Sequence, residues 1–305
     1  MKKRVLVTGG SGYIGSAIKE KLEAESWVVH LAGRSNESVL IMDFDDPSSI
    51  GACSVDQGVY DLCIHVAAAN EVDCINDPQK SMGINVLGTS ELISWCINAK
   101  IPRFIYISTF HVFGGNTGSL IENTKPQPLN LYGVSHYLAE EVVAMHDRCG
   151  DIEGATIRLP NVIGAPRNWP TFNRWTLAPF DFCRQAHNTH AIRLMSSGVQ
   201  KRNWLDINAF ADSLLEIALM DQIPKLIHLP GTDMSILELA NGVADSWRSI
   251  FGQTIEVQVP NENMDATVDP VRLFESLYNV QVRVPDVPAF VTSVGQYIAT
   301  YNKLN

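Results

Sequence analysis

The sequence predicts an α/β protein with a doubly wound parallel sheet and a smaller C-terminal lobe. In the first half, short β-branched runs alternate with amphipathic stretches, the pattern of successive βαβ units. A glycine-rich turn at residues 9–15 joins the first such run to the first helical stretch. These two observations together indicate a Rossmann-type fold.

The expected elements follow one another along the chain. Short apolar runs predict strands at residues 3–8, 28–31, 40–42, 62–66, 104–107 and 156–159. Behind the glycine turn, Ile14, Ile18 and Leu22 recur at helical spacing. Further helices are expected over residues 83–99 and from Leu131 onward. The helix that starts at Leu131 carries three apolar residues on one face: Leu138, Val142 and Met145.

The pattern changes after Gly164, where prolines and aromatic residues crowd a short stretch. We place a domain boundary near residue 165. Residues 1–165 form the first domain, and residues 166–305 form mainly a second lobe, with some segments returning to the sheet of the first domain.

Composition excludes several classes of partner. The chain has 305 residues, a formal charge of −10 and a pI near 5.2, so nucleic acid and anionic membrane surfaces are not expected partners. The basic start is followed by only three apolar residues before the glycines, too few for a signal peptide or a membrane span. We therefore expect a cytoplasmic protein.

The cysteines predict no metal site. Six cysteines are present, without a Cys-x-x-Cys pair or a histidine at metal-ligand spacing. We expect them to be reduced and mostly buried.

The glycine turn predicts a dinucleotide site because it follows a strand and opens a helix. Gly9 permits the tight turn, Gly12 lets backbone N–H groups approach a pyrophosphate, and Gly15 lets the helix pack closely on the strand. The helix N-terminus adds positive potential. The expected contacts from this turn are Gly9, Ser11, Gly12, Tyr13, Ile14 and Gly15.

The spacing Gly-x-x-Gly-x-x-Gly resembles that of the short-chain dehydrogenase/reductase superfamily. Two further strings, Asn85-Val86-Leu87-Gly88-Thr89 and Tyr132-Gly133-Val134-Ser135, resemble the extended branch, the nucleotide-sugar epimerases, dehydratases and reductases. The resemblance covers at least residues 3–164. It implies an NAD(P) cofactor, a nucleotide-sugar substrate and a homodimer formed through the helices of residues 83–99 and 132–145.

The end of the second strand favours NADP(H) over NAD(H). An NAD-selective site usually has a carboxylate there, but the position falls on Ala32, and Arg34 follows two residues later. A guanidinium can bind a 2′-phosphate. The alternative is a solvated Arg34 beside an unselective pocket. The resemblance adds Ala67 and Asp43 as cofactor contacts; Asp43 would lie near the adenine, or else serve as a turn residue.

The resemblance implies a hydride-transfer site built from Thr109 and Tyr132, with His136 where the family has a lysine. A phenol of pKa near 10 needs nearby positive charge to act as a base. His136 shares a helix face with Tyr132, and either ring nitrogen could bind the nicotinamide ribose. Because imidazole is mostly neutral at pH 7, the electrostatic help is weaker than a lysine's. The site is then either functional through His136 or impaired.

His111 is a candidate acid, or a hydrogen-bonded structural histidine. It follows Phe110, at positions where the 4,6-dehydratases of the family carry Asp-Glu, so the carboxyl pair for water elimination is missing. The resemblance implies that Asn161 and Arg202 contact the nucleotide diphosphate, with a salt bridge at the rim as the alternative for Arg202. The aromatic residues after Gly164 either form the core of the lobe or stack on the nucleobase.

Three functions remain open. The first is an NADP(H)-dependent oxidoreductase acting on a nucleotide-linked sugar, with reduction of a keto-sugar favoured. The second is a 4-epimerase that retains NAD(P). The third is a regulatory protein that binds a dinucleotide but is catalytically impaired at His136.

Overall fold

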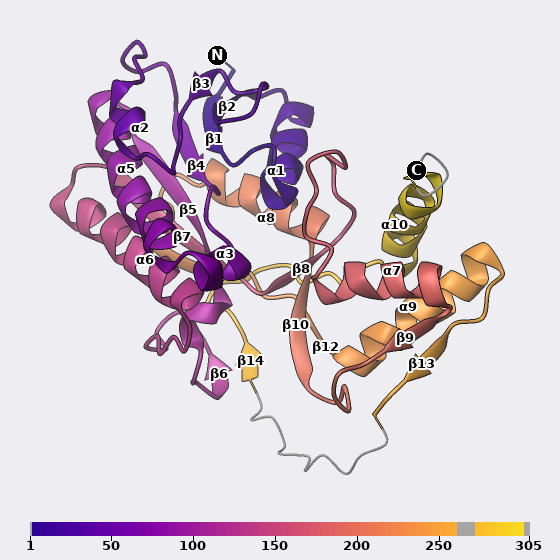
Figure 1. Cartoon of the computed structure of the whole chain (residues 1–305). Helices are drawn as coiled ribbons and strands as arrows, with labels where there is room; N and C mark the ends of the chain where they lie inside the picture. Colours follow the sequence, from indigo (N-terminus) through magenta and orange to yellow (C-terminus); the bar gives the residue numbers. More distant parts are fainter. Residues whose placement is uncertain (1, 261–271, 302–305) are drawn as a thin grey trace.

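The main sheet is parallel, with the strand order β3–β2–β1–β4–β5–β7–β11 (Figure 1). The computed structural model describes residues 2–260 and 272–301. The strands are β1 (Arg4–Thr8), β2 (Val28–Gly33), β3 (Leu40–Ile41), β4 (Leu62–His65), β5 (Arg103–Thr109), β7 (Glu153–Leu159) and β11 (Leu226–His228). The chain runs outward from β1 to β3 and returns to β4 beside β1. The predicted doubly wound α/β class is confirmed, and its switch point, where such sheets bind ligands, lies between β1 and β4.

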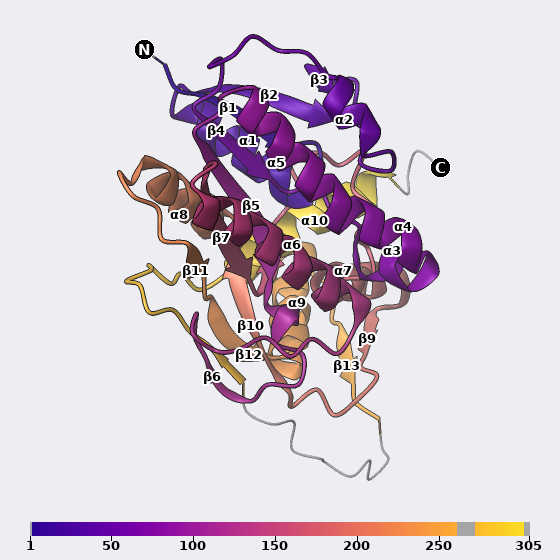
Figure 2. The ribbon, with the colours of Figure 1, turned by 90° about the vertical axis from the view of Figure 1, so that its left-hand side faces the viewer.

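Helices cover both faces of this sheet (Figures 1 and 2). α1 (Tyr13–Ala24) and α8 (Ile207–Leu219) pack on one face; α2 (Ser48–Ala52), α5 (Gly88–Asn98) and α6 (Leu131–Cys149) pack on the other. Successive strand residues alternate between the two cores, since Val5 and Val7 belong to the α1 side and Leu6 to the α5 side. Within the described residues, no helix is both long and apolar enough to cross a membrane.

The helical segment expected at residues 83–99 is divided. α4 (Pro78–Met82) leads into a single π-helical segment, η1 (Gly83–Leu87), before α5 begins. A short helix that the sequence pattern did not predict, α3 (Glu71–Asn76), precedes α4. Asn70 caps α3 in a reciprocal arrangement with Asp73.

α6 buries a different face from the one that its apolar residues suggest. Leu138 and Met145 point outward, with 39% and 44% of their surface exposed. The buried side instead carries polar residues, among them Ser135, His136 and Glu140. This burial is tolerated because Glu140 accepts hydrogen bonds from Ser108 and Arg158 of the sheet.

The second lobe begins where β8 (Asn161–Ile163) leaves the end of β7. β8 pairs with β10 (Lys201–Asp206), which pairs with β12 (Thr232–Ser235). Three helices pack together beside them: α7 (Ala178–Thr189), α9 (Ile236–Phe251) and α10 (Val287–Tyr301). Two small parallel pairs join β9 (Ala191–Arg193) to β13 (Glu256–Gln258), and β6 (Gly118–Leu120) to β14 (Arg272–Phe274). The aromatic residues after Gly164 contribute to the lobe core: Trp169, Phe172, Trp175, Phe180 and Phe182.

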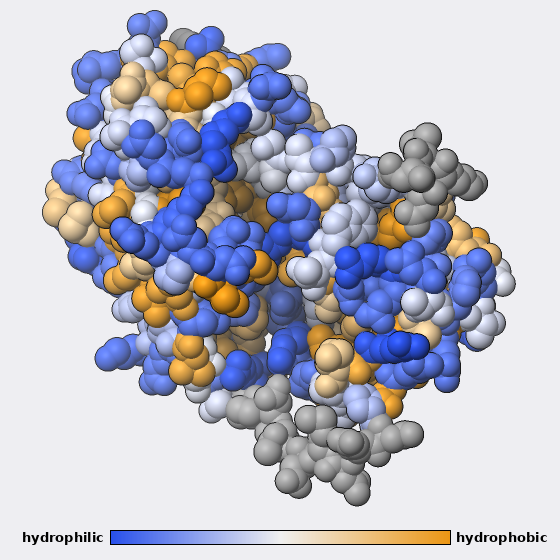
Figure 3. All heavy atoms as spheres, in the orientation of Figure 1, coloured by the Kyte–Doolittle hydropathy of each residue, from blue (hydrophilic) through white to orange (hydrophobic). Residues whose placement is uncertain are grey.

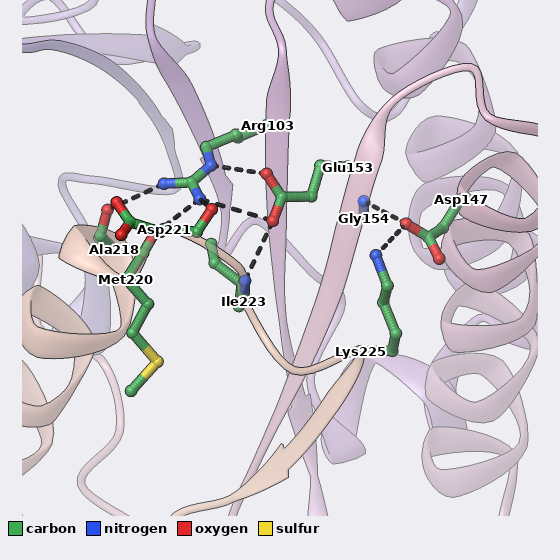
Figure 4. A network of polar contacts seen from close by, with 9 residues as sticks. All are labelled: Arg103, Asp147, Glu153, Gly154, Ala218, Met220, Asp221, Ile223 and Lys225. Carbon is green, nitrogen blue, oxygen red and sulfur yellow. Dashed lines mark hydrogen bonds and ion pairs between the residues drawn. The ribbon is translucent and has the colours of Figure 1, made fainter.

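A polar network fastens the segment that follows β10 to the main sheet (Figure 4). Arg103 of β5 pairs with Glu153 of β7 at 2.7 Å and donates to three carbonyl groups at the end of α8, those of Ala218, Met220 and Asp221. Glu153 also accepts from the backbone N–H of Ile223, which leads into β11. β11 therefore extends the main sheet beside β7, and α8 packs on that sheet, although both elements follow β8 and β10 in the sequence.

Candidate functional site

A cavity of about 1120 Å³ opens at the carboxyl ends of β1, β4 and β5. Residues of the glycine turn and of the loops after β4 and β5 line one side. The other side is lined by Arg202 and by six residues of the stretch before and at the start of α7: Thr171, Asn173, Arg174, Leu177, Ala178 and Pro179. Figure 3 shows the molecular surface hollowed between the two lobes. The cavity thus lies at the switch point of the sheet, enclosed by both parts of the chain.

The glycine turn has the geometry of a pyrophosphate cradle. Gly9 has φ +65°, and a Cβ there would come within 2.8 Å of the Ala67 backbone nitrogen. A Cβ on Gly15 would come within 2.2 Å of the Gly9 carbonyl oxygen. α1 starts without a side-chain cap and without an acidic residue in its first turn. Its first N–H groups are therefore left for an anion. Every predicted contact of the turn, and Ala67, lines the cavity.

The second lobe is attached directly to this turn. The hydroxyl group of Thr171 donates to the carbonyl oxygen of Ser11 at 3.1 Å. The buried hydroxyl group of Tyr13 donates to the carbonyl oxygen of Gly164 at 3.0 Å. The cradle is thereby held between the sheet and the start of the lobe.

A charged cluster lies at the end of β2. Arg34 pairs with Asp45 at 2.7 Å and lies 3.6 Å from Asp43, and Lys80 of α4 pairs with Asp45 at 2.7 Å. Arg34, Asp45 and Lys80 line the cavity, whereas the predicted cofactor contact Asp43 does not. β2 itself ends in Ala32 and Gly33. Lys80 and Asp45 were not predicted, since nothing in the spacing links them to Arg34.

Tyr132 and Thr109 meet at the inner end of the cavity. Thr109 is the last residue of β5, and Tyr132 lies in the first turn of α6, which Asn130 caps through the Gly133 N–H at 2.8 Å. Burial raises the pKa of Tyr132, and the Glu71 carboxylate raises it further, while Arg174 and a hydrogen bond with Thr109 oppose the rise. The Tyr132 phenol therefore keeps its proton at neutral pH.

His136 is a neutral imidazole in this site. Its pKa is lowered to about 4, mainly by burial; the Glu71 carboxylate opposes this fall and the neighbouring His111 adds to it. Its ring packs edge-to-face with that of Tyr132, with centroids 4.5 Å apart. An imidazolium that stabilises a Tyr132 phenolate is therefore not available at neutral pH. Its Nε2 atom is buried and has no hydrogen-bond partner among the described residues.

His111 belongs to the same cluster. It lies in η2 (Phe110–Phe113), and its backbone N–H donates to the Thr109 hydroxyl at 3.2 Å. Its ring centroid lies 5.5 Å from that of Tyr132. Burial lowers the pKa of His111 and Glu71 opposes the fall, so this side chain is also neutral at pH 7.

Glu71 and Arg174 complete the cluster, and neither was predicted. They form an ion pair of 2.6 Å across the cavity, from α3 and from the loop before α7. Burial raises the pKa of Glu71, but the Arg174 guanidinium outweighs it and holds that pKa below its ordinary value. Glu71 could have been predicted as a site residue, because it follows β4 closely at the switch point of the sheet. Arg174 could not, because the irregular stretch after Gly164 has no sequence pattern that relates it to the site.

The two predicted substrate contacts face the cavity from the lobe side. The side-chain amide of Asn161 donates to the Asn203 carbonyl at 3.1 Å, and Arg202 donates to the carbonyl of Lys201. The five aromatic residues of the lobe core are absent from the cavity wall formed by the described chain, so they do not offer a stacking surface there. No group of three or more metal-ligating side chains occurs within residues 2–260 and 272–301.

The residues present fit a dinucleotide. The cradle would hold the pyrophosphate, the Arg34 cluster lies where the adenosine ribose is expected, and the unpartnered His136 Nε2 lies beside Tyr132 at the other end. The hydroxyl groups of Thr109 and Tyr132 belong to residues that line the same end of the cavity as His136.

Comparison with known proteins places this site in context. Residues 5–226 match the model of the NAD dependent epimerase/dehydratase family. A putative UDP-glucose 4-epimerase of Methanocaldococcus jannaschii is 30% identical over 52% of this chain and 56% of its own length. The human dTDP-D-glucose 4,6-dehydratase is 28% identical over 78% of this chain and 72% of its own length. The chain thus spans only part of these relatives.

A solved structure shares the fold over nearly the whole chain. The UDP-glucuronic acid 4-epimerase of Bacillus cereus, solved with UDP-glucuronic acid and NAD, superposes with a TM-score of 0.74 at 20% identity. The superposition covers 98% of this chain and 99% of that one.

Proposed function

The chain belongs to the NAD-dependent epimerase/dehydratase family of extended short-chain dehydrogenases, and from that premise we propose that it reduces a keto group of a nucleotide-linked sugar with NADP(H). The observation that carries this proposal is the protonated Tyr132 beside Thr109. Reduction needs a proton donor at the carbonyl oxygen, whereas oxidation of an alcohol, the first step of 4-epimerisation, needs a base there.

The charges around Tyr132 favour the donor role. Family members that use the tyrosine as a base place a lysine four residues later, and here that residue is the neutral His136. Glu71 further disfavours the phenolate. Arg174 is the cation that acts on Tyr132, but it is paired with Glu71 at 2.6 Å. The tyrosine is therefore prepared to give a proton rather than to take one.

The residues of this chain divide the work as follows. Thr109 and Tyr132 hold the substrate carbonyl oxygen by hydrogen bonds. Tyr132 transfers its proton to that oxygen as the carbonyl carbon gains a hydride, and the phenolate regains a proton from solvent. The reduced nicotinamide, when bound, supplies the hydride. His111 borders the same space and, being neutral, can donate a hydrogen bond to a neighbouring sugar hydroxyl group.

The substrate class follows from the lobe side of the cavity. Arg202 and Asn161 offer a guanidinium and an amide at the rim, which suit a diphosphate. A chain of net charge −10 needs such local groups to hold an anion. This assignment rests on the family resemblance of both positions.

NADP(H) is favoured because two cations, Arg34 and Lys80, lie at the end of β2 where an NAD-selective site has a carboxylate. In the protein alone Asp45 pairs with both cations, and its single negative charge leaves this trio with a net positive charge. A 2′-phosphate would exchange with Asp45 for these two partners.

The apolar outer face of α6 supports the expected homodimer. Leu138 and Met145 expose 39% and 44% of their surface there, whereas Val142 packs partly against the core; Leu87, 60% exposed, lies in η1, which contacts α6. Exposed apolar stripes of this kind are buried when two copies associate.

The decisive experiment follows NADPH absorbance with a 4-keto nucleotide sugar as substrate. Reduction consumes NADPH in proportion to the sugar alcohol formed, and Tyr132→Phe slows it by about 10²–10⁴-fold while NADPH binding is retained. Interconversion of UDP-glucose and UDP-galactose without net cofactor consumption would establish the epimerase instead. Tight NADPH binding with no turnover of either substrate would indicate an impaired, regulatory protein.

A further inference from the structure

His136 of α6 has a close polar partner in the sheet. Its Nδ1 atom lies 2.6 Å from the hydroxyl oxygen of Tyr106 on β5, and the two rings stack with centroids 5.8 Å apart. Both side chains are almost completely buried, with 3% and 1% of their surface exposed. This contact fixes the orientation of the imidazole ring.

The contact also determines which ring nitrogen carries the proton. Burial raises the pKa of Tyr106 well above its ordinary value, so its hydroxyl group keeps its proton. Among the described residues, His136 Nδ1 is the one hydrogen-bond partner of that hydroxyl group. A buried phenol proton needs an acceptor, so Nδ1 accepts it and the imidazole proton is on Nε2.

The Nε2–H group then has no acceptor within the described chain. It is buried beside the Tyr132 ring, and the His136 side chain lines the cavity. Unpaired buried donors are rare in native proteins because each one loses its hydration without compensation. A ligand that accepts a hydrogen bond at this end of the cavity would give the Nε2–H group its missing partner.

We propose that Tyr106 is a positioning residue that holds His136 in the Nε2–H tautomer, so that an uncharged imidazole donates a hydrogen bond to the bound dinucleotide. In this chain, Tyr106 of the sheet and His136 of α6 together thereby replace the charged lysine that the family has at position 136. The inference rests on the dinucleotide site of the proposed function, but not on the reaction that the site performs.

The test is nuclear magnetic resonance of protein labelled with ¹⁵N in its histidine rings, with His136→Gln used to assign the His136 signals. We expect Nδ1 in the unprotonated range and Nε2 in the protonated range, and a shift of Nε2 when NADPH is added. Tyr106→Phe keeps the ring and removes the donor. It should mix the tautomers and weaken NADPH binding by about 3- to 30-fold, as for loss of one neutral hydrogen bond or slightly more.

Tyr60→Phe is the matched control. Tyr60 is a buried tyrosine whose hydroxyl group contacts Nδ1 of His30 at 2.9 Å, and neither residue lines the cavity. This variant should alter the His30 signals alone and leave NADPH binding unchanged.

Three results would overturn the proposal: a protonated Nδ1 in the wild type, an Nε2 signal that ignores NADPH, or a Tyr106→Phe variant indistinguishable from wild type. If Tyr106→Phe does not fold, the wild-type tautomer and its response to NADPH decide the question. If the wild type has the Nε2–H tautomer and its Nε2 signal responds to NADPH, but the protein reduces no keto-sugar, this inference is supported and the proposed reductase activity is contradicted. If the protein reduces a keto-sugar but its Nε2 signal does not respond to NADPH, the reductase activity is supported and this inference is contradicted.

Discussion

Glu71 and Arg174 join the two lobes across the cavity at 2.6 Å, beside the catalytic candidate Tyr132. They are 103 residues apart in the sequence. Glu71 raises the pKa of Tyr132 and Arg174 lowers it, so the pair acts on the tyrosine with opposing signs. Changes to either partner therefore report on the protonation of Tyr132.

Glu71→Gln should lower the pKa of Tyr132, because it removes a carboxylate and leaves the charge of Arg174 uncompensated. Arg174→Gln should raise it. Reduction requires the protonated phenol, so kcat falls at alkaline pH as Tyr132 loses its proton. This fall should begin at lower pH in Glu71→Gln and at higher pH in Arg174→Gln. The measurement is kcat against pH, with the phenolate absorbance that disappears in Tyr132→Phe as a second readout.

Each of these variants should lose about 1 kcal/mol of stability, since the pair is only partly buried. Asp181→Asn breaks the exposed pair with Arg184 and is the control that should leave the pH profile unchanged. If both cavity variants shift the profile in the same direction, the assigned roles are wrong.

Gly15→Ala should destabilise the fold by about 2–4 kcal/mol, because the new methyl group would lie 2.2 Å from the Gly9 carbonyl oxygen, a backbone atom that cannot rotate away. Gly12→Ala meets the same oxygen at 3.2 Å and should fold. Its methyl group lies where the pyrophosphate approaches, so NADPH binding should fall by roughly tenfold or more. Urea unfolding and calorimetry measure the two effects. Gly51→Ala is the control: its methyl group would meet open space, so it should change neither the stability nor the affinity for NADPH. If Gly12→Ala bound NADPH with wild-type affinity, the glycine turn would not be the pyrophosphate site.

The sheet and the cradle could be predicted because their signals are local. Each predicted strand of the main sheet is a short apolar run, and the glycine turn encodes its close approaches in consecutive residues. Tyr132 and Thr109 were found from motifs of the same local kind.

The electrostatics of the site could not be predicted because they depend on residues from distant segments. The sequence showed His136 in the place of a lysine, but not that Tyr106, 30 residues away, binds its Nδ1. It showed Arg34, but not that Asp45 and Lys80 lie against it. The apolar residues of α6 were misleading for the same reason. The side of α6 that faces the sheet carries Glu140, and its partners Ser108 and Arg158 come from β5 and β7.

Arg34→Met and Lys80→Met should each weaken NADPH binding by roughly 10- to 100-fold and change NADH binding little, because each removes one charge-assisted contact to the 2′-phosphate. Asp45→Asn should strengthen NADPH binding, since it removes the carboxylate that holds both cations. Fluorescence titration with both reduced cofactors measures this. Lys19→Met, remote from the cavity on α1, is the control. Equal losses for NADH and NADPH would show that the cluster does not select the cofactor.

Three buried neutral histidines should make the protein sensitive to acid. Burial lowers the pKa of His65 to about 3, and those of His136 and His228 to about 4. Each group is neutral in the folded state but gains a proton in the unfolded state below its ordinary value near 6.5. Stability is therefore complete above that pH and falls as the pH drops toward the folded-state pKa, by roughly 2 kcal/mol per histidine at pH 5.

Urea unfolding at pH 7 and pH 5 tests this sensitivity. His136→Gln should reduce the loss between the two pH values by about 2 kcal/mol, because one titrating group is removed. His190→Asn, which removes an exposed histidine at the end of α7, provides the comparison. An equal loss in wild type and His136→Gln would show that His136 is not held neutral by the fold.

The outer stripe of α6 should hold two copies of the chain together. Leu138 and Met145 expose 39% and 44% of their surface on a helix face that has no partner within the described residues. Burying the exposed two-fifths of each side chain contributes about 0.6–1.3 kcal/mol, and a symmetric dimer buries both residues twice, so Leu138→Glu with Met145→Glu should raise the dimer dissociation constant by roughly 100-fold or more. Analytical ultracentrifugation measures the change, and the folded monomer should keep its circular dichroism spectrum. Met195→Glu, at a methionine 92% exposed on the second lobe, should leave the dimer intact. A wild-type protein that is monomeric at micromolar concentration would remove the basis for this interface.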